Sequence, residues 1–264
     1  MAAFTLQEVE KATGGRLLYP VVDDAVFSQV ETDTRAITAG ALFVALRGET
    51  FDGHDYVLQA EKQGASGAIV AEDRPEYRKG GFAVIIVPDT RKAYQDLARF
   101  HRRRFSIPVI AVTGSVGKTS TRSMIAAVLS QKYRVLQTEK NFNNEIGLPK
   151  TLLQLTPEHE ACVVEMGMRG LGQIAELAAI AEPDIGVVTN VGKSHIELLG
   201  SQENIARAKS ELVQALSADG IAILNQDDSY VASMADLCRG KVVGYGITSN
   251  AAIRASRVVC SEKG

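Results

Sequence analysis

No charge of either sign dominates this sequence, in which 29 Lys and Arg stand against 31 Asp and Glu for a net charge of −2. Without a basic surplus, we expect no nucleic-acid partner. The longest apolar runs have only the length of a strand, so we expect no membrane insertion. The first residues lack a basic region followed by an apolar stretch, which predicts no export signal. These absences favour a cytoplasmic protein.

Cysteine is also scarce, with three residues, Cys162, Cys238 and Cys260, far apart in the sequence. Their number is odd and their spacing is not that of a metal cluster, which fits a reducing compartment. We interpret each cysteine as a small buried residue.

The chain has 264 residues, of which 45% are hydrophobic and 23% are charged. This is the composition of a soluble globular protein, and the length suffices for two domains. Residues 1–88 form the first predicted domain, a small α/β unit. Its predicted elements are a helix at 4–15 with Thr5 as N-cap, strands at 41–46, 67–70 and 83–87, and a helix at 54–63.

Residues 89–107 are expected to connect the domains through a helix that Asp89 caps. This helix ends in the basic cluster His101-Arg102-Arg103-Arg104. The cluster has two interpretations, a phosphate site or a solvated helix C-terminus, where positive charge suits the helix dipole. We favour the solvated helix end.

Residues 108–264 alternate between apolar strands and amphipathic helices. Predicted strands lie at 108–113, 134–138, 160–165, 184–189, 220–225 and 241–245, and predicted helices at 118–131, 148–154, 171–181, 201–216 and 227–238. Such alternation indicates a mostly parallel sheet covered by helices, so the fold class is α/β. Ligands bind at the C-terminal ends of the strands in such sheets, and the polar loops should converge there.

A glycine-rich turn joins the first of these strands to a helix: Thr113-Gly114-Ser115-Val116-Gly117-Lys118-Thr119-Ser120. Its glycines allow backbone N–H groups to approach an anion closely. Lys118 can reach the β- and γ-phosphates of a nucleotide, and the hydroxyl of Thr119 can bind Mg²⁺. The longer pattern G-x-x-x-x-G-K-[ST] is not met, because Val112 occupies its first glycine position. We predict phosphate binding, because a plain turn would need neither Lys118 nor Thr119.

Two charged or polar residues follow later strands of the same sheet. Glu165 ends an apolar strand, and beside the phosphate loop its carboxylate can hold Mg²⁺. The alternative is an ordinary solvated strand end. His195 lies in the loop that begins at Thr189, and we expect it to hold a metal or phosphate, although a lone histidine is more often structural.

Lys209 lies on the apolar face that Ile205, Val213 and Leu216 define on the helix 201–216. Lysine is rarely buried without a partner. Either its stem packs while the ammonium reaches solvent, or the side chain enters the active site as a modified, negatively charged group that helps to hold Mg²⁺.

Two polar segments are less informative. Asn225 ends a predicted strand and is a candidate nucleotide contact, while Asp227 or Asp228 can cap the following helix. The loop that contains Asn143 and Asn144 has no metal-ligand spacing and looks like an ordinary polar turn.

Together, these segments resemble the Mur ligases, the ATP-dependent enzymes that build the peptide of the bacterial cell-wall precursor. The resemblance covers nearly the whole chain and is carried by Thr32–Arg35, Gly40–Glu49, Asp52–Asp55, Thr113–Ser120, Asn141–Pro149, Glu165–Gly167, Thr189–His195 and Ala206–Glu211. The Asn-Asn-x-Ile-Gly-x-Pro loop and the Glu-Met-Gly segment are most similar to the member that adds D-Ala-D-Ala to UDP-MurNAc-tripeptide. The member that adds the third amino acid is the alternative.

The resemblance implies a role for each candidate residue. The N-terminal domain would hold the UDP part of the substrate through Thr34, Arg35, Phe43, Gly48 and His54. The phosphate loop would bind ATP, and Thr119, Glu165 and His195 would hold two Mg²⁺ ions. Lys209 would be carbamylated and would orient the second Mg²⁺. Asn143 and Asn144 would lie near the muramoyl-peptide.

The resemblance also implies a reaction, in which ATP phosphorylates the substrate carboxylate and the amine of D-Ala-D-Ala displaces phosphate from the acyl phosphate. The family continues into an adenine-contacting segment and a third domain, neither of which appears before Gly264, so we expect a fragment. Two other classes stay open: a phosphate-loop NTPase or kinase that makes no amide bond, and a non-catalytic protein that binds the UDP precursor. The residues imply no particular oligomeric state.

Overall fold

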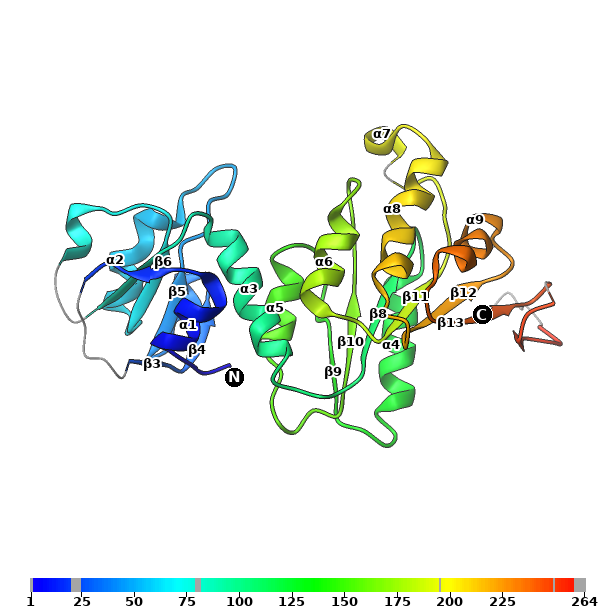
Figure 1. Ribbon diagram of the computed structural model, residues 1–264, viewed down its shortest axis with the longest axis horizontal. Coiled ribbons are helices and arrows are strands. Elements are labelled where there is room, and N and C mark those ends of the chain that lie inside the picture. Colours follow the sequence, from blue (N-terminus) through cyan, green and yellow to red (C-terminus); the bar gives the residue numbers. More distant parts are fainter. Residues whose placement is uncertain (1, 20–24, 79–81, 195, 249, 259–264) are drawn as a thin grey trace. The chain divides into compact units, whose positions relative to one another are not determined.

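The computed structural model describes residues 2–19, 25–78, 82–194, 196–248 and 250–258 (Figure 1). They form two compact units, one of Met1–Phe105 with Leu152–Thr156 and the other of Ser106–Thr151 with Pro157–Gly264. Both units combine helices with a sheet, so the α/β fold class is confirmed.

A five-stranded sheet organises the first unit, with strand order β2-β7-β6-β5-β4. Its strands are β2 (Arg16–Leu17), β4 (Gln29–Glu31), β5 (Ala41–Val44), β6 (Gly67–Val70) and β7 (Ala83–Ile86), and a separate antiparallel pair joins β1 (Phe4–Thr5) to β3 (Val26–Phe27). The strands from β4 to β7 are parallel, and β2 runs antiparallel to β7. The three predicted strands are confirmed as β5, β6 and β7. The other strands have two or three residues and are too short to show an alternating pattern.

Side chains define where two helices of this unit begin. The unit contains α1 (Leu6–Thr13), η1 (Thr34–Ala36), η2 (Gly53–Tyr56), α2 (Val57–Lys62), η3 (Pro75–Arg78) and α3 (Thr90–Arg102). The Thr5 hydroxyl accepts the N–H of Glu8 at 3.2 Å, and the Glu8 carboxylate accepts the N–H of Thr5 at 2.9 Å. This capping box confirms Thr5 as the N-cap of α1. Asp89 caps α3 in the same way, by accepting two backbone N–H groups of its first turn.

The basic cluster at the end of α3 is only partly solvated. The expectation of a solvated helix end is wrong for His101 and Arg102, which are 3% and 8% exposed. The Nε2 of His101 donates a hydrogen bond to the carbonyl of Leu155 at 2.9 Å. The end of α3 is buried because a segment distant in sequence, Leu152–Thr156, belongs to the same unit.

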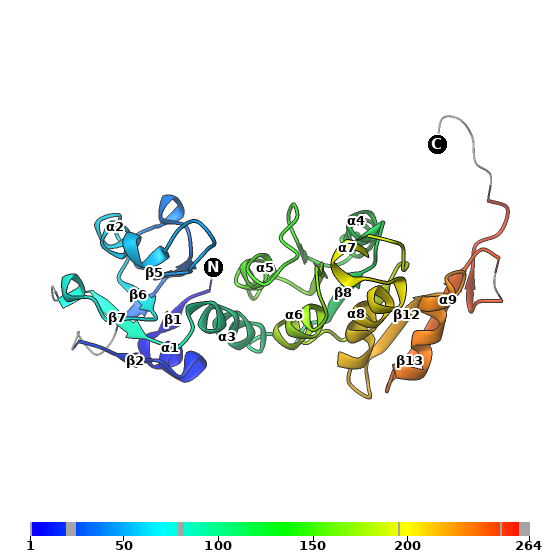
Figure 2. The ribbon, with the colours of Figure 1, turned by 90° about the horizontal axis from the view of Figure 1, so that it is seen from above.

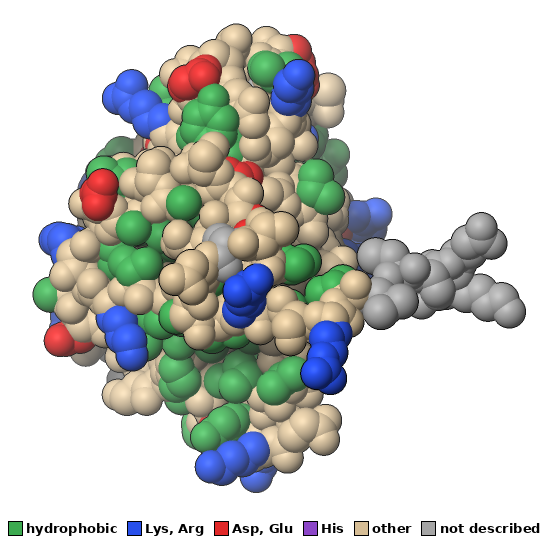
Figure 3. Space-filling model, turned by 90° about the vertical axis from the view of Figure 1, so that its right-hand side faces the viewer, with side chains coloured by type: hydrophobic (Ala, Val, Ile, Leu, Met, Phe, Trp, Pro, Cys, Tyr) green, Lys and Arg blue, Asp and Glu red, His purple; other side chains and the backbone are tan. Residues whose placement is uncertain are grey.

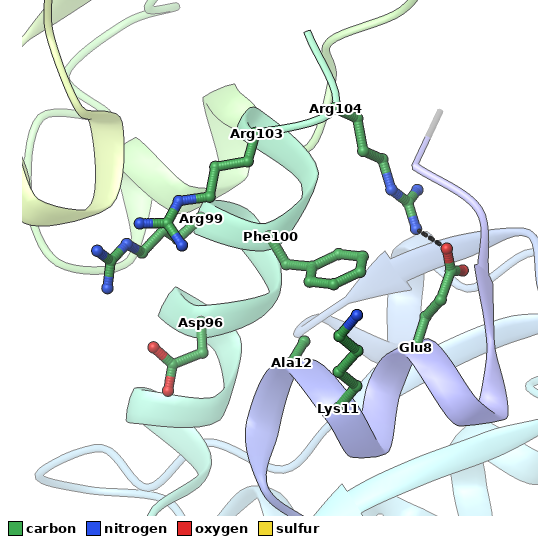
Figure 4. Close-up of a pocket in the computed structure, with 8 residues that line it drawn as sticks. All are labelled: Glu8, Lys11, Ala12, Asp96, Arg99, Phe100, Arg103 and Arg104. Carbon is green, nitrogen blue, oxygen red and sulfur yellow. Dashed lines mark ion pairs between the residues drawn. The ribbon is translucent and has the colours of Figure 1, made fainter.

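Helices α1 and α3 border a cavity of about 500 Å³ (Figure 4). Figure 4 shows Arg104 turned toward Glu8, with which it forms an ion pair at 2.9 Å, while Arg99 and Arg103 point to the other side of α3. The guanidinium carbon of Arg104 also lies 5.1 Å from the centre of the Phe100 ring. The charge of Arg104 therefore already has partners within the unit, which weakens the phosphate-site interpretation of the cluster.

The buried His101 should make stability depend on pH. Burial lowers its pKa to about 4, so the folded protein keeps a neutral imidazole where the unfolded chain, with a pKa of about 6.5, binds a proton. The free energy of unfolding should fall as the pH drops from about 6.5 to about 4, by at most about 1.4 kcal/mol per pH unit. His101→Gln keeps an N–H donor for Leu155 but does not titrate, so urea denaturation at several pH values should show a flatter profile. Equal pH dependence in both proteins would contradict this prediction.

Seven parallel strands form the sheet of the second unit, in the order β14-β13-β12-β11-β8-β10-β9. They are β8 (Val109–Thr113), β9 (Val135–Gln137), β10 (Ala161–Glu165), β11 (Ile185–Val188), β12 (Ile221–Asn225), β13 (Lys241–Gly246) and β14 (Ile253–Arg254). The predicted mostly parallel sheet is confirmed, and β14 is an addition of two residues that sequence patterns did not indicate.

Helices cover both faces of this sheet. They are α4 (Lys118–Leu129), α5 (Gly147–Leu152), α6 (Gln173–Ala181), α7 (Ile196–Leu199), α8 (Gln202–Ala215), α9 (Ser229–Ala232) and η4 (Ser233–Leu237). Helix α4 lies on one face, and α6 and α8 pack together on the other (Figure 2). The helix predicted at 227–238 is divided between α9 and η4, and the short α7 was not predicted.

The order of the strands reverses at β8, which pairs with β10 on one side and β11 on the other. The chain builds β9 and β10 on one side of β8 and then β11, β12 and β13 on the other. In open parallel sheets, ligands bind beyond the C-terminal ends of the strands at such a reversal. The turn that follows β8 lies at this position.

Apolar side chains on the face shown in Figure 3 occur in separate areas between Lys and Arg side chains. The exposed apolar residues of the second unit include Met124 and Val128 on α4. These two residues are four positions apart and share one exposed face of α4, and an apolar area of this small size is normal for a protein surface. Within the residues that the structure describes, no helix is long and apolar enough to cross a membrane.

Candidate nucleotide and substrate sites

The turn between β8 and α4 requires glycine at two positions. Gly117 has φ 82° and forms the N-cap of α4, and Gly114 has φ 153°. A Cβ on Gly114 would lie 1.8 Å from the hydroxyl oxygen of Thr189, so space as well as backbone conformation excludes a side chain there. The turn therefore leads backbone N–H groups to the start of α4, where the helix dipole favours an anion.

The loop after β11 holds this turn in place. The side-chain amide of Asn190 accepts the N–H of Val116 and donates to the Val116 carbonyl, both at 2.9 Å. The Thr189 hydroxyl donates to the same carbonyl at 2.8 Å, and the Asn190 carbonyl accepts the N–H of Ser115 at 3.0 Å. The backbone of the turn is thus hydrogen-bonded on both its N–H and C=O groups before any ligand binds.

Three candidate side chains come together at the start of α4. The Nζ of Lys118 donates to the carbonyl of Gly114 at 2.9 Å. The Thr119 hydroxyl donates to Oε2 of Glu165 at 2.8 Å, so α4 meets the end of β10. The Glu165 side chain is no solvated strand end, because the residue is 2% exposed.

The oxygen atoms of Thr119 and Glu165 fit a Mg²⁺–nucleotide. Mg²⁺ takes oxygen ligands, binds through one or two carboxylates, and completes its shell with phosphates and water. Within the described part of the chain, no group of three or more His, Cys, Asp and Glu could hold a metal ion. Thr119 and Glu165 supply one hydroxyl and one carboxylate, so phosphates and water would complete the shell of a Mg²⁺ ion bound there.

Asn143 and Asn144 have different partners in the loop before α5. The Nδ2 of Asn143 donates to Oε1 of Glu165 at 2.8 Å. The Oδ1 of Asn144 accepts the N–H of Gly147 at 2.8 Å at the start of α5. The structure thus brings Asn143, but not the side chain of Asn144, to the carboxylate.

The side chain of Asn225 is engaged within the protein at both ends. Its Nδ2 donates to the carbonyl of Thr189 at 2.9 Å, and its Oδ1 accepts the N–H of Asp227 at 3.0 Å. Asp228 caps α9, as one of the two predicted alternatives. His195 lies outside the described residues.

Lys209 is buried on α8, with 3% exposure, beside the fully buried Ile205 and Val213. The alternative in which its ammonium reaches solvent is therefore wrong. Burial and, secondarily, the charge of Lys118 lower the pKa of Lys209 to about 7. A large share of this amine is neutral near neutral pH, unlike an exposed lysine.

Arg122 is a charged residue of this region that sequence patterns missed. It lies one helical turn after Lys118 and is 6% exposed, and within the described residues its Nε has no hydrogen-bond partner. The sequence did contain a signal for the burial of Arg122. This residue lies four positions from both Lys118 and the buried Ala126, and residues four apart share a helix face.

Removal of the Asn190 side chain should loosen the turn without unfolding the unit. Asn190→Ala deletes both side-chain bonds to Val116, and one such bond is worth about 1 kcal/mol. Hydrogen exchange of the Val116 amide should therefore accelerate roughly tenfold, which corresponds to ~1.4 kcal/mol. The Ser115 amide, bonded to the Asn190 backbone, should change less. Equal acceleration of both amides would show that the side chain has no specific role.

The first unit has a pocket of about 410 Å³ beside the end of β5. It is lined by Thr32, Asp33, Thr34, Arg35, Phe43, Phe51, Gly53, Tyr56 and Gln59. Asp33 holds the guanidinium of Arg35 through three hydrogen bonds, at 2.7, 2.9 and 3.2 Å. Phe51 and Tyr56 are exposed aromatic side chains. Aromatic surface beside hydroxyls and a paired guanidinium and carboxylate suits a ligand with a flat ring and polar groups.

Gly48 and His54 are not among the described residues that line this pocket, but they support residues that do. Gly48 donates its N–H to the carbonyl of Phe51 at 2.9 Å, and a Cβ there would lie 2.4 Å from the Phe51 ring. His54 is 2% exposed, with Nδ1 2.5 Å from Asp52 and Nε2 accepting the N–H of Ala71 at 2.8 Å. Since both ring nitrogens are used, His54 stabilises the turn around η2 rather than offering a free hydrogen-bonding group.

Known sequence families account for most of the chain. Residues 112–264 match the Mur ligase middle domain, and residues 26–102 match the Mur ligase family, catalytic domain. The chain belongs to the Mur ligase family. The resemblance that the motifs indicated is thereby confirmed.

Several Mur ligases of known sequence or structure are similar to this chain. The UDP-N-acetylmuramoyl-tripeptide–D-alanyl-D-alanine ligase of Synechocystis sp. is 51% identical over 227 residues, which cover 85% of this chain and 50% of that protein. The crystal structure of MurF from Acinetobacter baumannii has a TM-score of 0.90 at 32% identity and covers 97% of this chain and 55% of that one. MurF from Thermotoga maritima in complex with ADP has a TM-score of 0.77 at 31% identity and covers 84% and 51%. The chain thus spans about half the length of the Mur ligases it matches.

Proposed function

We propose that the chain is the substrate- and ATP-binding part of a cytoplasmic bacterial Mur ligase that adds D-Ala-D-Ala to UDP-MurNAc-tripeptide. The observation that carries this proposal is the placement of Lys118, Thr119 and Glu165 together at the C-terminal edge of the parallel sheet. The 51% identity to a D-alanyl-D-alanine ligase supports the choice of substrate. In this proposal, residues 1–88 bind the UDP-substrate and residues 108–264 bind ATP. Residues 89–107 connect these two domains.

The phosphate loop and Lys118 bind the phosphates of ATP, an assignment that the ADP complex of a similar MurF supports. Thr119, Glu165 and His195 would hold Mg²⁺, whose charge would neutralise that of the phosphates. The substrate carboxylate attacks the γ-phosphorus and ADP leaves. The amine of D-Ala-D-Ala then attacks the acyl carbon, phosphate leaves, and the amine loses a proton to solvent. The protein contributes positioning and electrostatic stabilisation to both steps.

Lys209 is carbamylated in this proposal. Its neutral amine attacks the carbon of CO₂ and loses a proton to solvent, which leaves a carboxylate-like anion in place of the buried amine. The anion lies near Lys118, whose charge lowers the amine pKa and favours the anionic product. A carbamate also offers oxygen ligands to Mg²⁺, which a bare amine does not.

Carbon-13 NMR of the chain in labelled bicarbonate, with ADP and Mg²⁺, tests the carbamate directly. A carbamate resonance should appear and should be lost in Lys209→Met. Lys118→Met should weaken it at neutral pH, because the pKa of the amine rises and the anion loses a nearby cation. Absence of the resonance from the unsubstituted chain, or its persistence in Lys209→Met, would refute the assignment.

The pocket of the first unit is the proposed UDP site. Phe51→Ala should weaken UDP-MurNAc-tripeptide binding roughly tenfold, because stacking of a base on an aromatic ring contributes about 1–3 kcal/mol. Calorimetric titration measures this affinity, with Tyr133→Ala, an exposed aromatic residue of the second unit, as the matched control. Unchanged affinity in folded Phe51→Ala would place the UDP site elsewhere.

The same titration separates the alternative functions. Tighter binding of UDP-MurNAc-dipeptide than of the tripeptide would favour the ligase that adds the third amino acid. Precursor binding without any ATP-dependent product in the full-length protein would favour a non-catalytic binding role.

A further inference from the structure

Two sequence motifs of the second unit interlock at Glu165. The N–H of Gly167 donates to the backbone carbonyl of Asn143 at 2.8 Å, and the Asn143 side chain donates to Glu165 at 2.8 Å. A Cβ on Gly167 would lie 2.9 Å from Oδ1 of Asn143, so only glycine at this position leaves enough space for the Asn143 side chain. The Asn-Asn loop and the Glu-Met-Gly segment therefore form one local structure.

The carboxylate of Glu165 is held from two sides. Thr119 of α4 donates to Oε2, and Asn143 of the loop after β9 donates to Oε1, each at 2.8 Å. The backbone N–H of Glu165 is also fixed, because it donates to the hydroxyl of Thr138 at 3.0 Å. Each carboxylate oxygen has one named donor, so the plane of the carboxylate has a defined orientation in a nearly dry environment.

The loop that carries Asn143 is itself anchored on both flanks. On one side, the N–H of Thr138 donates to the carbonyl of Val163 in β10 at 3.0 Å. On the other, Asn144 holds the start of α5 through the N–H of Gly147. The backbone of Asn143 is thus fixed. Its side-chain amide therefore donates to the Glu165 carboxylate from a defined position.

We propose that Asn143 is a positioning residue for Glu165, which it orients toward the Mg²⁺–nucleotide, rather than a contact of the muramoyl-peptide. This inference rests on the proposed function, which assigns Mg²⁺ to Thr119 and Glu165. Only an N–H donor performs the task, since an aspartate at position 143 would place a second carboxylate against the first. Partners that orient a metal ligand change metal affinity about 10–100-fold when removed.

Calorimetric titration of ADP over a range of Mg²⁺ concentrations tests the proposal on the chain as it exists. Asn143→Ala should raise the Mg²⁺ concentration needed for half-maximal enhancement of ADP binding by at least about tenfold. ADP affinity in excess EDTA should stay the same, because the phosphate loop is untouched. Asn141, an exposed asparagine of the same loop, provides the matched control. Asn141→Ala should leave the Mg²⁺ requirement unchanged.

Asn143→Asp adds a readout that a purely structural role would not move. The paired carboxylates should lower the melting temperature in EDTA. Addition of Mg²⁺ with ADP should then raise the melting temperature of Asn143→Asp by more than it raises that of the unsubstituted chain. This variant keeps the shape of asparagine, so it serves if Asn143→Ala fails to fold.

Two results would overturn the proposal and are distinguishable from failure of the proposed function. The first is an unchanged Mg²⁺ requirement in Asn143→Ala together with weakened UDP-MurNAc-tripeptide binding, which would return Asn143 to the muramoyl-peptide. The second is equal Mg²⁺-dependent recovery of the melting temperature in Asn143→Asp and the unsubstituted chain. Failure of the unsubstituted chain to bind ADP at any Mg²⁺ concentration would instead refute the nucleotide site itself.

Discussion

The hydrogen bonds between the Asn190 side chain and Val116 are the interaction on which the proposed nucleotide site depends. One side-chain amide satisfies both the N–H and the C=O of a residue in the middle of the turn. These groups would otherwise be free to rotate, and a ligand would have to order them at a cost in conformational entropy. Because the turn is already fixed, the position at which α4 begins is also fixed. This determines where Lys118 and Thr119 lie.

The parallel sheet supplies the rest of the site through the placement of its strand ends. β8, β10, β11 and β12 are neighbours or near neighbours in the sheet and end at the same edge. The turn after β8 accordingly meets Glu165 at the end of β10 and the Thr189 loop after β11, and Asn225 at the end of β12 supports that loop. Residues separated by many positions in sequence become adjacent because the strands have one direction and nearly one length.

Local patterns in the sequence predict those parts of the structure that depend on local physics. The apolar runs predict the strands, the glycine and lysine spacing predicts the turn, and the helical angle of Lys209 predicts its burial. The Thr5 cap is predictable because its partner Glu8 is three residues away. Val116 and Asn190 are 74 positions apart, and their hydrogen bond leaves no local pattern. The same limit applies to His54, for which the family resemblance implies a substrate contact although Asp52 and Ala71 occupy both ring nitrogens.

The interior position of β8 in its sheet has a consequence for the order of folding. Val109 pairs with Cys162 and Ile110 with Ile185, whereas β9, the next strand in the chain, pairs with β10. At a synthesis rate of about 5–20 residues per second, the apolar strand β8 waits on the order of 3–10 s for its first partner. A chain that stops before β10 is complete leaves both edges of β8 without their native partners, and such edges promote aggregation. The strand order that places the turn after β8 at the sheet edge thereby leaves this stretch of the nascent chain exposed to aggregation until β10 is complete.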